Sequence, residues 1–275
     1  MLAERLSRVR ERIHEACQRS GRAPESVTLV AVTKTVPVEL IREAIALGVT
    51  DIGENRVQEA RIKREALGQM RNAECGMRSE EQRHSEFRIP NSELGWVRWH
   101  MVGHLQRNKA KDAVELFDVI HSVDSVELAE ELERQTARTG QATSDKGQAT
   151  KEAAIEVFIQ VNVSGEATKS GCNPDEVNQL AQAVQRSPHL QWRGLMTIPP
   201  FSDDPEDARP HFRRLRDLRD ELQRSLHSAF RIPHSALLLS MGMSHDFEVA
   251  IEEGADVVRI GTAIFATSDK GQATS

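Results

Sequence analysis

Short apolar runs alternate with amphipathic helical patterns along most of the sequence, and this alternation limits the possible folds more than any other feature. The runs, which we expect to be strands, cover 27–34, 50–53, 97–103, 117–122, 155–163, 191–198, 236–241 and 256–261. The helical patterns between them lie near 37–47, 54–67, 105–116, 125–138, 174–187, 205–228 and 245–253. Runs of this kind are typical of strands that are buried on both faces in a parallel sheet.

Eight such strands with helices between them predict an α/β protein, a single closed (β/α)8 TIM-like barrel with an extra helix over residues 2–20. A doubly wound open sheet is the alternative, because hydrophobic periodicity does not separate the two folds. The number of units favours the barrel. The length of 275 residues is usual for such a barrel as one domain.

Two repeated sequences interrupt this alternation. ATSDKGQAT occurs at 142–150 and again at 266–274, and FRIPNSEL at 87–94 is echoed by FRIPHSAL at 230–237. The two offsets differ, so the repeats are not units of a solenoid. Their polar, glycine- and serine-rich or proline-containing make-up is typical of surface insertions.

The domain organisation follows from these segments. We expect one domain over 1–266, with inserted loops at about 68–95 and 140–152. Residues 267–275 are expected to form a disordered tail.

Composition argues against several classes of partner. The formal net charge of -6 disfavours nucleic acid or an anionic membrane as the main partner. No apolar run has transmembrane length, and the amphipathic N-terminus lacks the apolar core of a signal peptide. Cys17, Cys75 and Cys172 are few, odd in number and far apart. We therefore expect a cytoplasmic protein in a reducing compartment.

Lys34 ends the first predicted strand, an unusual place for a charged residue. In a barrel the C-terminal ends of all strands meet at one face, where the functional sites lie. A lysine partly removed from water there has a lowered pKa, so its amine is more often neutral and able to form a Schiff base with an aldehyde. The alternative is a side chain that simply reaches solvent. Lys169 is the rival candidate, but it follows a polar loop and is expected to be hydrated.

The loops after the last two predicted strands contain residues suited to phosphate. Ser240, Gly242 and Ser244 end the seventh strand, and Gly261 and Thr262 end the eighth. Loops at this position of a barrel bind phosphate through backbone N–H groups and hydroxyls. The alternative is a pair of ordinary strand-to-helix turns, with Ser244 capping a helix.

A lysine that accepts an aldehyde, across the barrel mouth from a phosphate site, predicts a pyridoxal phosphate site. Arg259 in the eighth strand would then meet the pyridine nitrogen. Because an arginine does not readily exchange a proton there, the ring nitrogen would stay largely unprotonated. The ring would be a poor electron sink, which argues against demanding carbanion chemistry.

Two other polar groups have structural explanations. His100 and His104 would lie about 13 Å apart in a strand that rises ~3.3 Å per residue, too far to share an ion, so we expect no metal site. Arg107, Lys109 and Lys111 predict a solvated basic edge at a helix start, with an anionic ligand or partner as the alternative.

Seven motifs in order closely resemble the pyridoxal phosphate homeostasis proteins, formerly described as proline synthase co-transcribed proteins. They are AVTKTVP, DIGENRVQEA, WHMVGHLQRNK, IQVNVSGEATKSG, GLMTIPP, LSMGMSHDFEVAI and VVRIGTAIF. The resemblance runs from about Val27 to Phe265, apart from the two insertions. It implies a barrel like the N-terminal domain of alanine racemase, with pyridoxal 5'-phosphate held as a Schiff base on Lys34.

The resemblance also implies the other binding residues. It assigns Ser240, Ser244, Gly261 and Thr262 to the phosphate, Arg259 to the ring nitrogen and Asn55 to the cofactor's surroundings. From the sequence pattern alone, Asn55 is better explained as capping a turn. Proteins of this family are generally cytosolic, lack a firmly established reaction and influence vitamin B6 and amino-acid balance. The insertions and the repeat-derived tail depart from the family pattern without touching a motif residue.

The leading functional prediction is a carrier or buffer for intracellular pyridoxal phosphate without robust catalysis, so we assign no catalytic residue. The alternative is a pyridoxal-dependent enzyme similar to an amino-acid racemase. Racemisation by the alanine racemase route uses a lysine and a tyrosine on opposite faces of the substrate, and this sequence contains no tyrosine. A third hypothesis is a barrel that binds another phosphate, with Lys34 acting only as a charge. We expect a monomer, with apo pyridoxal-dependent enzymes as candidate recipients.

Overall fold

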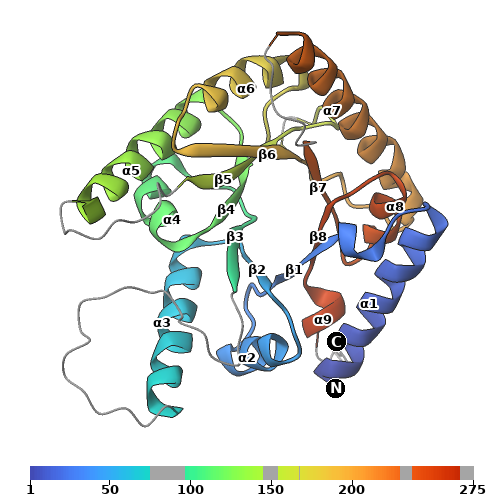
Figure 1. Ribbon diagram of the computed structural model, residues 1–275. Coiled ribbons are helices and arrows are strands. Elements are labelled where there is room, and N and C mark those ends of the chain that lie inside the picture. The colour runs from blue at the N-terminus through green and yellow to red at the C-terminus, as the bar shows by residue number, and fades with distance from the viewer. Residues whose placement is uncertain (75–96, 145–153, 167, 230–236, 267–275) are drawn as a thin grey trace, which may run out of the picture.

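Eight parallel strands form the centre of the molecule (Figure 1). They are β1 (Thr28–Val32), β2 (Asp51–Glu54), β3 (Arg98–Met101), β4 (Val119–Val123), β5 (Ile155–Gln160), β6 (Leu190–Met196), β7 (Leu238–Met243) and β8 (Val257–Ile260). Each strand pairs with the next in chain order, and β8 pairs with β1. The predicted closed barrel is therefore confirmed. The computed structural model describes residues 1–74, 97–144, 154–166, 168–229 and 237–266.

Helices surround the barrel and fill the connections between its strands (Figure 1). The α-helices are α1 (Leu2–Arg19), α2 (Val38–Ala46), α3 (Val57–Glu74), α4 (Ala110–Leu116), α5 (Val126–Ser144), α6 (Val177–Gln185), α7 (Arg209–Ala229), α8 (Phe247–Glu252) and α9 (Thr262–Phe265). Short 3-10 turns are η1 (Pro24–Ser26), η3 (Arg107–Lys109), η4 (Pro174–Glu176) and η5 (Pro205–Ala208). The last three lead directly into α4, α6 and α7.

The predicted loops differ from the structure at their first residues. Helix α3 runs to Glu74 and α5 to Ser144, so 68–74 and 140–144 are helical rather than irregular. The remainder of both predicted loops and the predicted tail lie outside the described residues. Helix α9 was not predicted.

Side chains alternate along the strands and build two cores, because successive strand residues point to opposite faces. One set faces the helices and includes Ala31 of β1 and Ile52 of β2. The other set fills the barrel interior and consists of Val30, Val102, Val119, Phe158, Met196 and Val257. A polar group that points inward therefore lies in an apolar environment.

Helix α1 packs beside α8 and α9, next to the last strand (Figure 1). Its buried face repeats at helical spacing and consists of Leu2, Leu6, Val9, Ile13, Ala16 and Cys17. Arg5 on this helix donates from Nε to Ile264 O at 2.7 Å and from Nη1 to Ala266 O at 2.7 Å. The first helix is thus tied to the backbone that follows β8.

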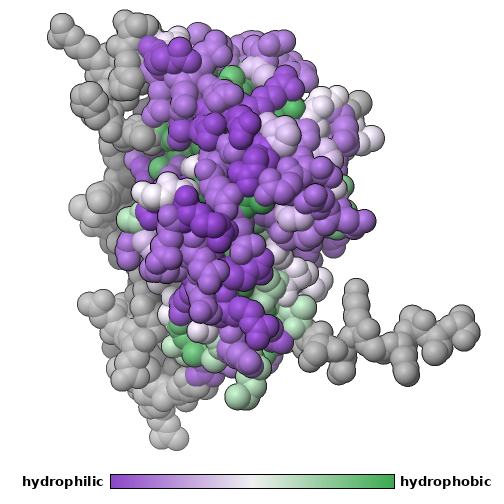
Figure 2. All heavy atoms as spheres, turned by 90° about the vertical axis from the view of Figure 1, so that its right-hand side faces the viewer, coloured by the Kyte–Doolittle hydropathy of each residue, from purple (hydrophilic) through white to green (hydrophobic). Residues whose placement is uncertain are grey.

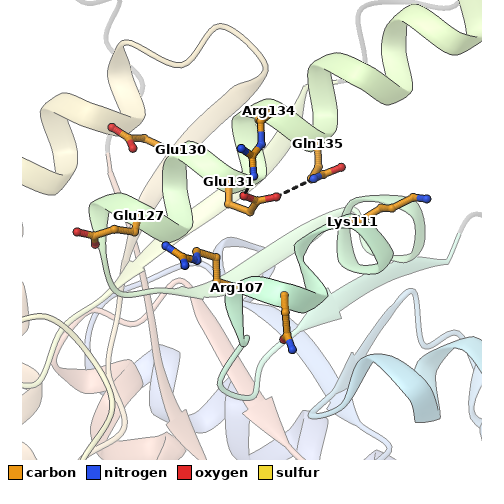
Figure 3. A pocket seen from close by; sticks show the side chains of 8 residues that line it. Arg107, Lys111, Glu127, Glu130, Glu131, Arg134 and Gln135 are labelled. Atoms are coloured by element: carbon orange, nitrogen blue, oxygen red, sulfur yellow. Dashed lines mark hydrogen bonds and ion pairs between the residues drawn. The ribbon is translucent and has the colours of Figure 1, made fainter.

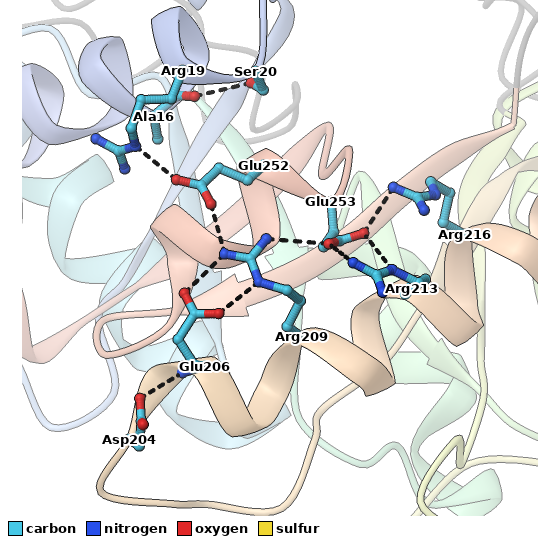
Figure 4. Close-up of polar contacts among 10 residues, drawn as sticks. All are labelled: Ala16, Arg19, Ser20, Asp204, Glu206, Arg209, Arg213, Arg216, Glu252 and Glu253. Atoms are coloured by element: carbon cyan, nitrogen blue, oxygen red, sulfur yellow. Dashed lines mark hydrogen bonds and ion pairs between the residues drawn. The ribbon is translucent and has the colours of Figure 1, made fainter.

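An arginine–glutamate network joins α1, α7 and α8 (Figure 4). Glu252 of α8 accepts from Arg19 and Arg209, while the buried Glu253 accepts from Arg209 and Arg213 and pairs with Arg216. Figure 2 shows that the outer surface on this side is largely hydrophilic. In the part of the chain that the structure describes, no helix combines the length and apolarity that crossing a membrane requires.

Candidate functional site

Lys34 lies in a tight turn directly after β1. Thr33 O accepts the Val36 N–H at 2.9 Å, so Lys34 and Thr35 are the two central residues of the turn. Thr35 has φ 60°, in the left-handed region that a threonine rarely adopts. Such a residue costs about 1–3 kcal/mol and persists only where its surroundings fix it. Lys34 itself is exposed, so the described residues do not supply the shielding from water that we expected for this amine.

The strand register brings other predicted residues to the same rim as Lys34. Val32 pairs with Gly53, so the turn that carries Lys34 and the segment that begins at Asn55 after β2 leave the barrel at the same rim. On the other side Ala31 pairs with Ile260, which puts the loop after β8 level with the end of β1. The predicted phosphate loop after β8 therefore lies beside Lys34. Our expectation that it faces the lysine across the barrel mouth was wrong, because β8 is hydrogen-bonded to β1.

Ser244 connects the loops after β7 and β8. Its Oγ accepts the backbone N–H groups of Gly261 at 3.2 Å and Ala263 at 3.3 Å. These two bonds use the lone pairs of the hydroxyl and leave its O–H as a donor. Gly242, just before this loop, has φ 91°, and a Cβ there would lie 2.6 Å from Ala250 Cβ. Glycine thus allows the end of β7 to pass close over α8.

Asn55 is half-buried at the end of β2 and is held by the loop after β3. A Cβ on Gly103 would lie 2.4 Å from Asn55 O, so only glycine allows this contact. Thr262, at the other side of Lys34, is exposed. Lys34, Asn55, Ser244 and Thr262 therefore belong to adjoining loops at one end of the barrel.

Arg259 and Ser240 lie deeper, inside the barrel. Arg259 is only 3% exposed. Its Nη1 donates to Ser240 Oγ at 2.7 Å and its Nη2 donates to Thr197 O at 2.8 Å. Burial lowers the pKa of Arg259 to about 10, so the guanidinium still carries its charge at neutral pH. Ser240 is thus bonded to Arg259 inside the barrel, whereas Ser244 lies in the loop that follows β7. The assignment of Ser240 to a phosphate stays a prediction.

A chain of hydrogen bonds continues from Ser240 through the barrel interior. Ser240 Oγ lies 2.8 Å from His121 Nδ1, His121 Nε2 lies 2.9 Å from His100 Nδ1, and His100 Nε2 lies 2.9 Å from Asp51 Oδ1. His121 also stacks on Phe158 with the ring centroids 4.6 Å apart. Sequence reasoning considered His100 as a metal ligand and as a possible base in a racemase-like enzyme, and it missed His121 and Asp51. Both residues occur at the alternate strand positions that also place valines in the barrel interior, and this alternation could have predicted that they point inward.

The charges of this chain follow from burial. Burial, and then the positive charges around it, keep the pKa of His121 well below the ordinary 6.5, so this imidazole is neutral. Burial alone would raise the pKa of Asp51, but hydrogen bonds from His100 and Thr50 outweigh it and hold that pKa below its usual value. All these bonds can form together if each residue donates to the next, in the order Arg259, Ser240, His121, His100 and Asp51. His104, by contrast, pairs with Asp124 at 3.4 Å.

A surface pocket of about 600 Å³ lies apart from these residues, between η3, α4 and α5 (Figure 3). Its lining consists of Arg107, Asn108, Lys111, Glu127, Glu130, Glu131, Arg134 and Gln135. Glu131 bonds Arg134 and Gln135 within the pocket. Two residues of the predicted basic edge therefore face acidic neighbours, and none of the predicted cofactor residues lines the pocket.

Comparisons with known proteins agree with the motifs and the fold. The family model described as alanine racemase, N-terminal domain, matches residues 5–269. The pyridoxal phosphate homeostasis protein of Aquifex aeolicus is 43% identical over 262 residues, 95% of this chain and 96% of that protein. The chain belongs to the pyridoxal phosphate homeostasis protein family.

Two other known proteins match along almost their whole length. The pyridoxal phosphate homeostasis protein of Pseudomonas aeruginosa is 38% identical over 274 residues, 100% of this chain and 99% of that protein. PipY of Synechococcus elongatus PCC7942, solved with PLP bound, has a TM-score of 0.72 and 32% identity and covers 97% of this chain and 100% of its own. These two proteins therefore match the whole of the fold that the structure describes.

Proposed function

We propose that this protein binds pyridoxal 5'-phosphate at Lys34 and acts as a carrier or buffer of the cofactor without robust catalysis. The observation that carries the proposal is the position of Lys34, in a strained turn at the same rim as Asn55 and beside the Ser244–Gly261 loops. The full-length relationship to PipY, whose structure holds PLP, supports the same ligand.

The residues at this rim fit the chemical groups of the cofactor. Pyridoxal phosphate brings an aldehyde, whose carbon forms a C=N bond with a neutral amine as one water is released. The amine of Lys34 lies at an exposed position on this rim, where an aldehyde can reach it. The Ser244 O–H and the exposed Thr262 hydroxyl are donors for phosphate oxygens. Asn55 follows β2 at the same rim of the barrel.

Arg259 supports a carrier rather than a carbanion-forming enzyme. Its guanidinium keeps its proton, so at the pyridine nitrogen it would donate a hydrogen bond without transferring charge. The ring would then accept electrons poorly. The sequence has no tyrosine to serve as the second base of the alanine racemase route. A racemase-like enzyme remains the alternative, and a different pair of bases would be needed for it.

The expected setting is a monomer in the cytoplasm that delivers pyridoxal phosphate to apo enzymes. Cys17 and Cys172 are buried free thiols, which suits a reducing compartment. Burial raises the pKa of Cys172 to about 12. Light scattering during size-exclusion chromatography tests the monomer, and a mass of two chains would contradict it.

Reduction with borohydride tests the site directly. The loaded protein should be yellow, and peptide mapping after reduction should find the cofactor on Lys34. Lys34→Ala should abolish the visible band, whereas the matched control Lys169→Ala should retain it. A label on Lys169 would overturn the site assignment, and a colourless mixture would favour a different phosphate ligand.

Two further measurements separate carrier from enzyme. The loaded protein, mixed with an apo pyridoxal-dependent enzyme, should reactivate it faster than spontaneous release of the cofactor allows. Exchange of the α-proton of alanine or serine in D₂O should stay close to that of free pyridoxal phosphate. Fast exchange with loss of stereochemistry would favour the racemase-like alternative.

A further inference from the structure

A buried ion pair lies directly beneath the turn that carries Lys34. Glu54, the last residue of β2, is fully buried on the side of the strand that faces the helices. Lys63 extends from α3, and its Nζ lies 2.7 Å from Glu54 Oε1. The side chain of Lys63 is only 9% exposed. The cofactor chemistry proposed for the rim uses neither residue.

Both members of this pair hold Thr33, the residue before Lys34. Thr33 Oγ1 donates to Glu54 Oε1 at 2.5 Å, and Lys63 Nζ donates to Thr33 O at 2.6 Å. The Thr33 N–H donates to Gly53 O at 2.9 Å. Every polar group of Thr33 is therefore fixed, including the carbonyl that closes the Lys34 turn by accepting the Val36 N–H.

Burying this ion pair costs folding free energy. Burial is the largest influence on Glu54 and raises its pKa, despite the hydrogen bonds from Lys63 and Thr33. Glu54 Oε2 has no hydrogen-bond partner within the described part of the chain. A well-packed apolar pair at such a place is often as stable as a buried ion pair or more so. The contacts to Thr33 are what an apolar pair would not provide.

We propose that Glu54 and Lys63 are positioning residues, which clamp Thr33 and thereby hold the strained Lys34–Thr35 turn at the rim. This inference rests on the proposed role of Lys34 as the cofactor lysine. The positive φ of Thr35 is the conformation that such a clamp has to maintain. Lys63 does not compete for the aldehyde, because its ammonium is buried and bonded to Glu54 and Thr33.

The test compares variants that remove the clamp with a matched change on the same helix. Glu54→Met/Lys63→Met removes both charges and both groups that bond Thr33 at similar volume, and so leaves no unpaired buried charge. Lys63→Arg keeps the charge and tests rescue. Arg61→Met is the control, since Arg61 pairs with Asp112, away from the turn, at 2.7 Å.

Two readouts separate positioning from stability. The first is amide hydrogen exchange of Val36 in the protein without cofactor, beside the thermal unfolding midpoint. The second is the rate at which added pyridoxal phosphate attaches to Lys34, measured as the fraction of Lys34 labelled when borohydride is added after different times. In the double variant we expect Val36 to exchange about tenfold faster and labelling of Lys34 to slow about tenfold, at an unfolding midpoint close to the parent's. Lys63→Arg should recover part of both losses, and Arg61→Met should match the parent protein.

Each outcome decides the proposal. Unchanged exchange and labelling in the double variant would overturn the positioning role while leaving Lys34 as the cofactor lysine. A parent protein that never labels Lys34, with exchange that still rises in the variant, would refute the proposed function and leave the clamp in place. If the double variant does not fold, Val36 exchange in the parent decides: an unprotected amide there would show that the turn is not held.

Discussion

His100 Nδ1 lies 2.9 Å from His121 Nε2, and this contact joins β3 to β4 through the inside of the barrel. At its two ends the chain of hydrogen bonds terminates in opposite charges, Asp51 and Arg259. Barrel interiors are usually filled by branched apolar side chains. Here a polar path crosses that interior and holds Arg259, so its members affect both stability and its dependence on pH.

Ser240→Ala should reduce the free energy of unfolding by about 1–3 kcal/mol, because it leaves buried donors and acceptors of Arg259 and His121 unpaired. Urea unfolding measures the change. The control is Ser26→Ala, which removes an exposed hydroxyl and should stay within about 0.5 kcal/mol of the parent. Equal stabilities for the two variants would contradict the structural role of the Ser240 hydroxyl.

His121 should make the protein less stable as the pH falls below about 6.5. Its pKa in the folded protein lies well below the ordinary 6.5 because the ring is buried, so the unfolded chain takes up a proton that the folded protein does not. One proton corresponds to a slope of at most about 1.4 kcal/mol per pH unit. His121→Gln should remove this part of the slope in urea unfolding at a series of pH values. His14→Gln, at an exposed histidine, should leave it unchanged.

Glu253 should contribute a second loss of stability at lower pH. Burial tends to raise its pKa, but hydrogen bonds from Arg213 and Arg209 outweigh burial and hold the pKa below the ordinary 4.5. The contribution is therefore complete above about 4.5 and disappears as the pH falls through the folded-state pKa. Glu253→Gln should cost about 1–2 kcal/mol at neutral pH and should flatten the acid limb of the stability profile. An acid limb as steep as that of the parent, or of the exposed control Glu4→Gln, would refute this assignment.

Gly242→Ala should destabilise the protein more than Gly21→Ala, although both glycines have positive φ. At Gly21, with φ 67°, an added Cβ meets no atom within 4 Å, so only backbone strain is introduced. At Gly242 the Cβ would lie 2.6 Å from Ala250 Cβ and 2.9 Å from Phe247 Cα. The additional crowding should cost about 1–3 kcal/mol beyond the Gly21→Ala effect in urea unfolding. Similar losses at both positions would mean that β7 and α8 separate easily.

The strands and the position of Lys34 were predictable because buried parallel strands require apolar runs and short connections. Helix ends were less predictable. Residues 68–74 and 140–144 have a polar composition that suggested loops, yet they continue α3 and α5. Glutamine, alanine and arginine have good helix propensity, which a judgement based on polarity alone ignores.

The interior chain was not predictable in the same way. It depends on which residues of β3, β4, β7 and β8 are level with one another. The pairing of β4 with β5 shifts between Ile120 and Val123, and that of β7 with β8 shifts between Ser240 and Met243. A sequence pattern contains no record of such shifts, and a slip of one residue would turn His121 to the opposite face. The Glu54–Lys63 pair was missed because the sequence analysis weighed Lys34, Lys169 and the basic edge at 107–111 but no lysine further along a helix.

The two bonds from Arg5 give the first helix an effect on the opposite end of the sequence. Arg5 and Ile264 are 259 residues apart, and Ile264 lies two residues beyond Thr262 of the proposed phosphate loop. During synthesis this loop can acquire its final anchor only after nearly the whole barrel has left the ribosome. The final position of this loop is thus a property of the assembled fold rather than of the loop's own sequence.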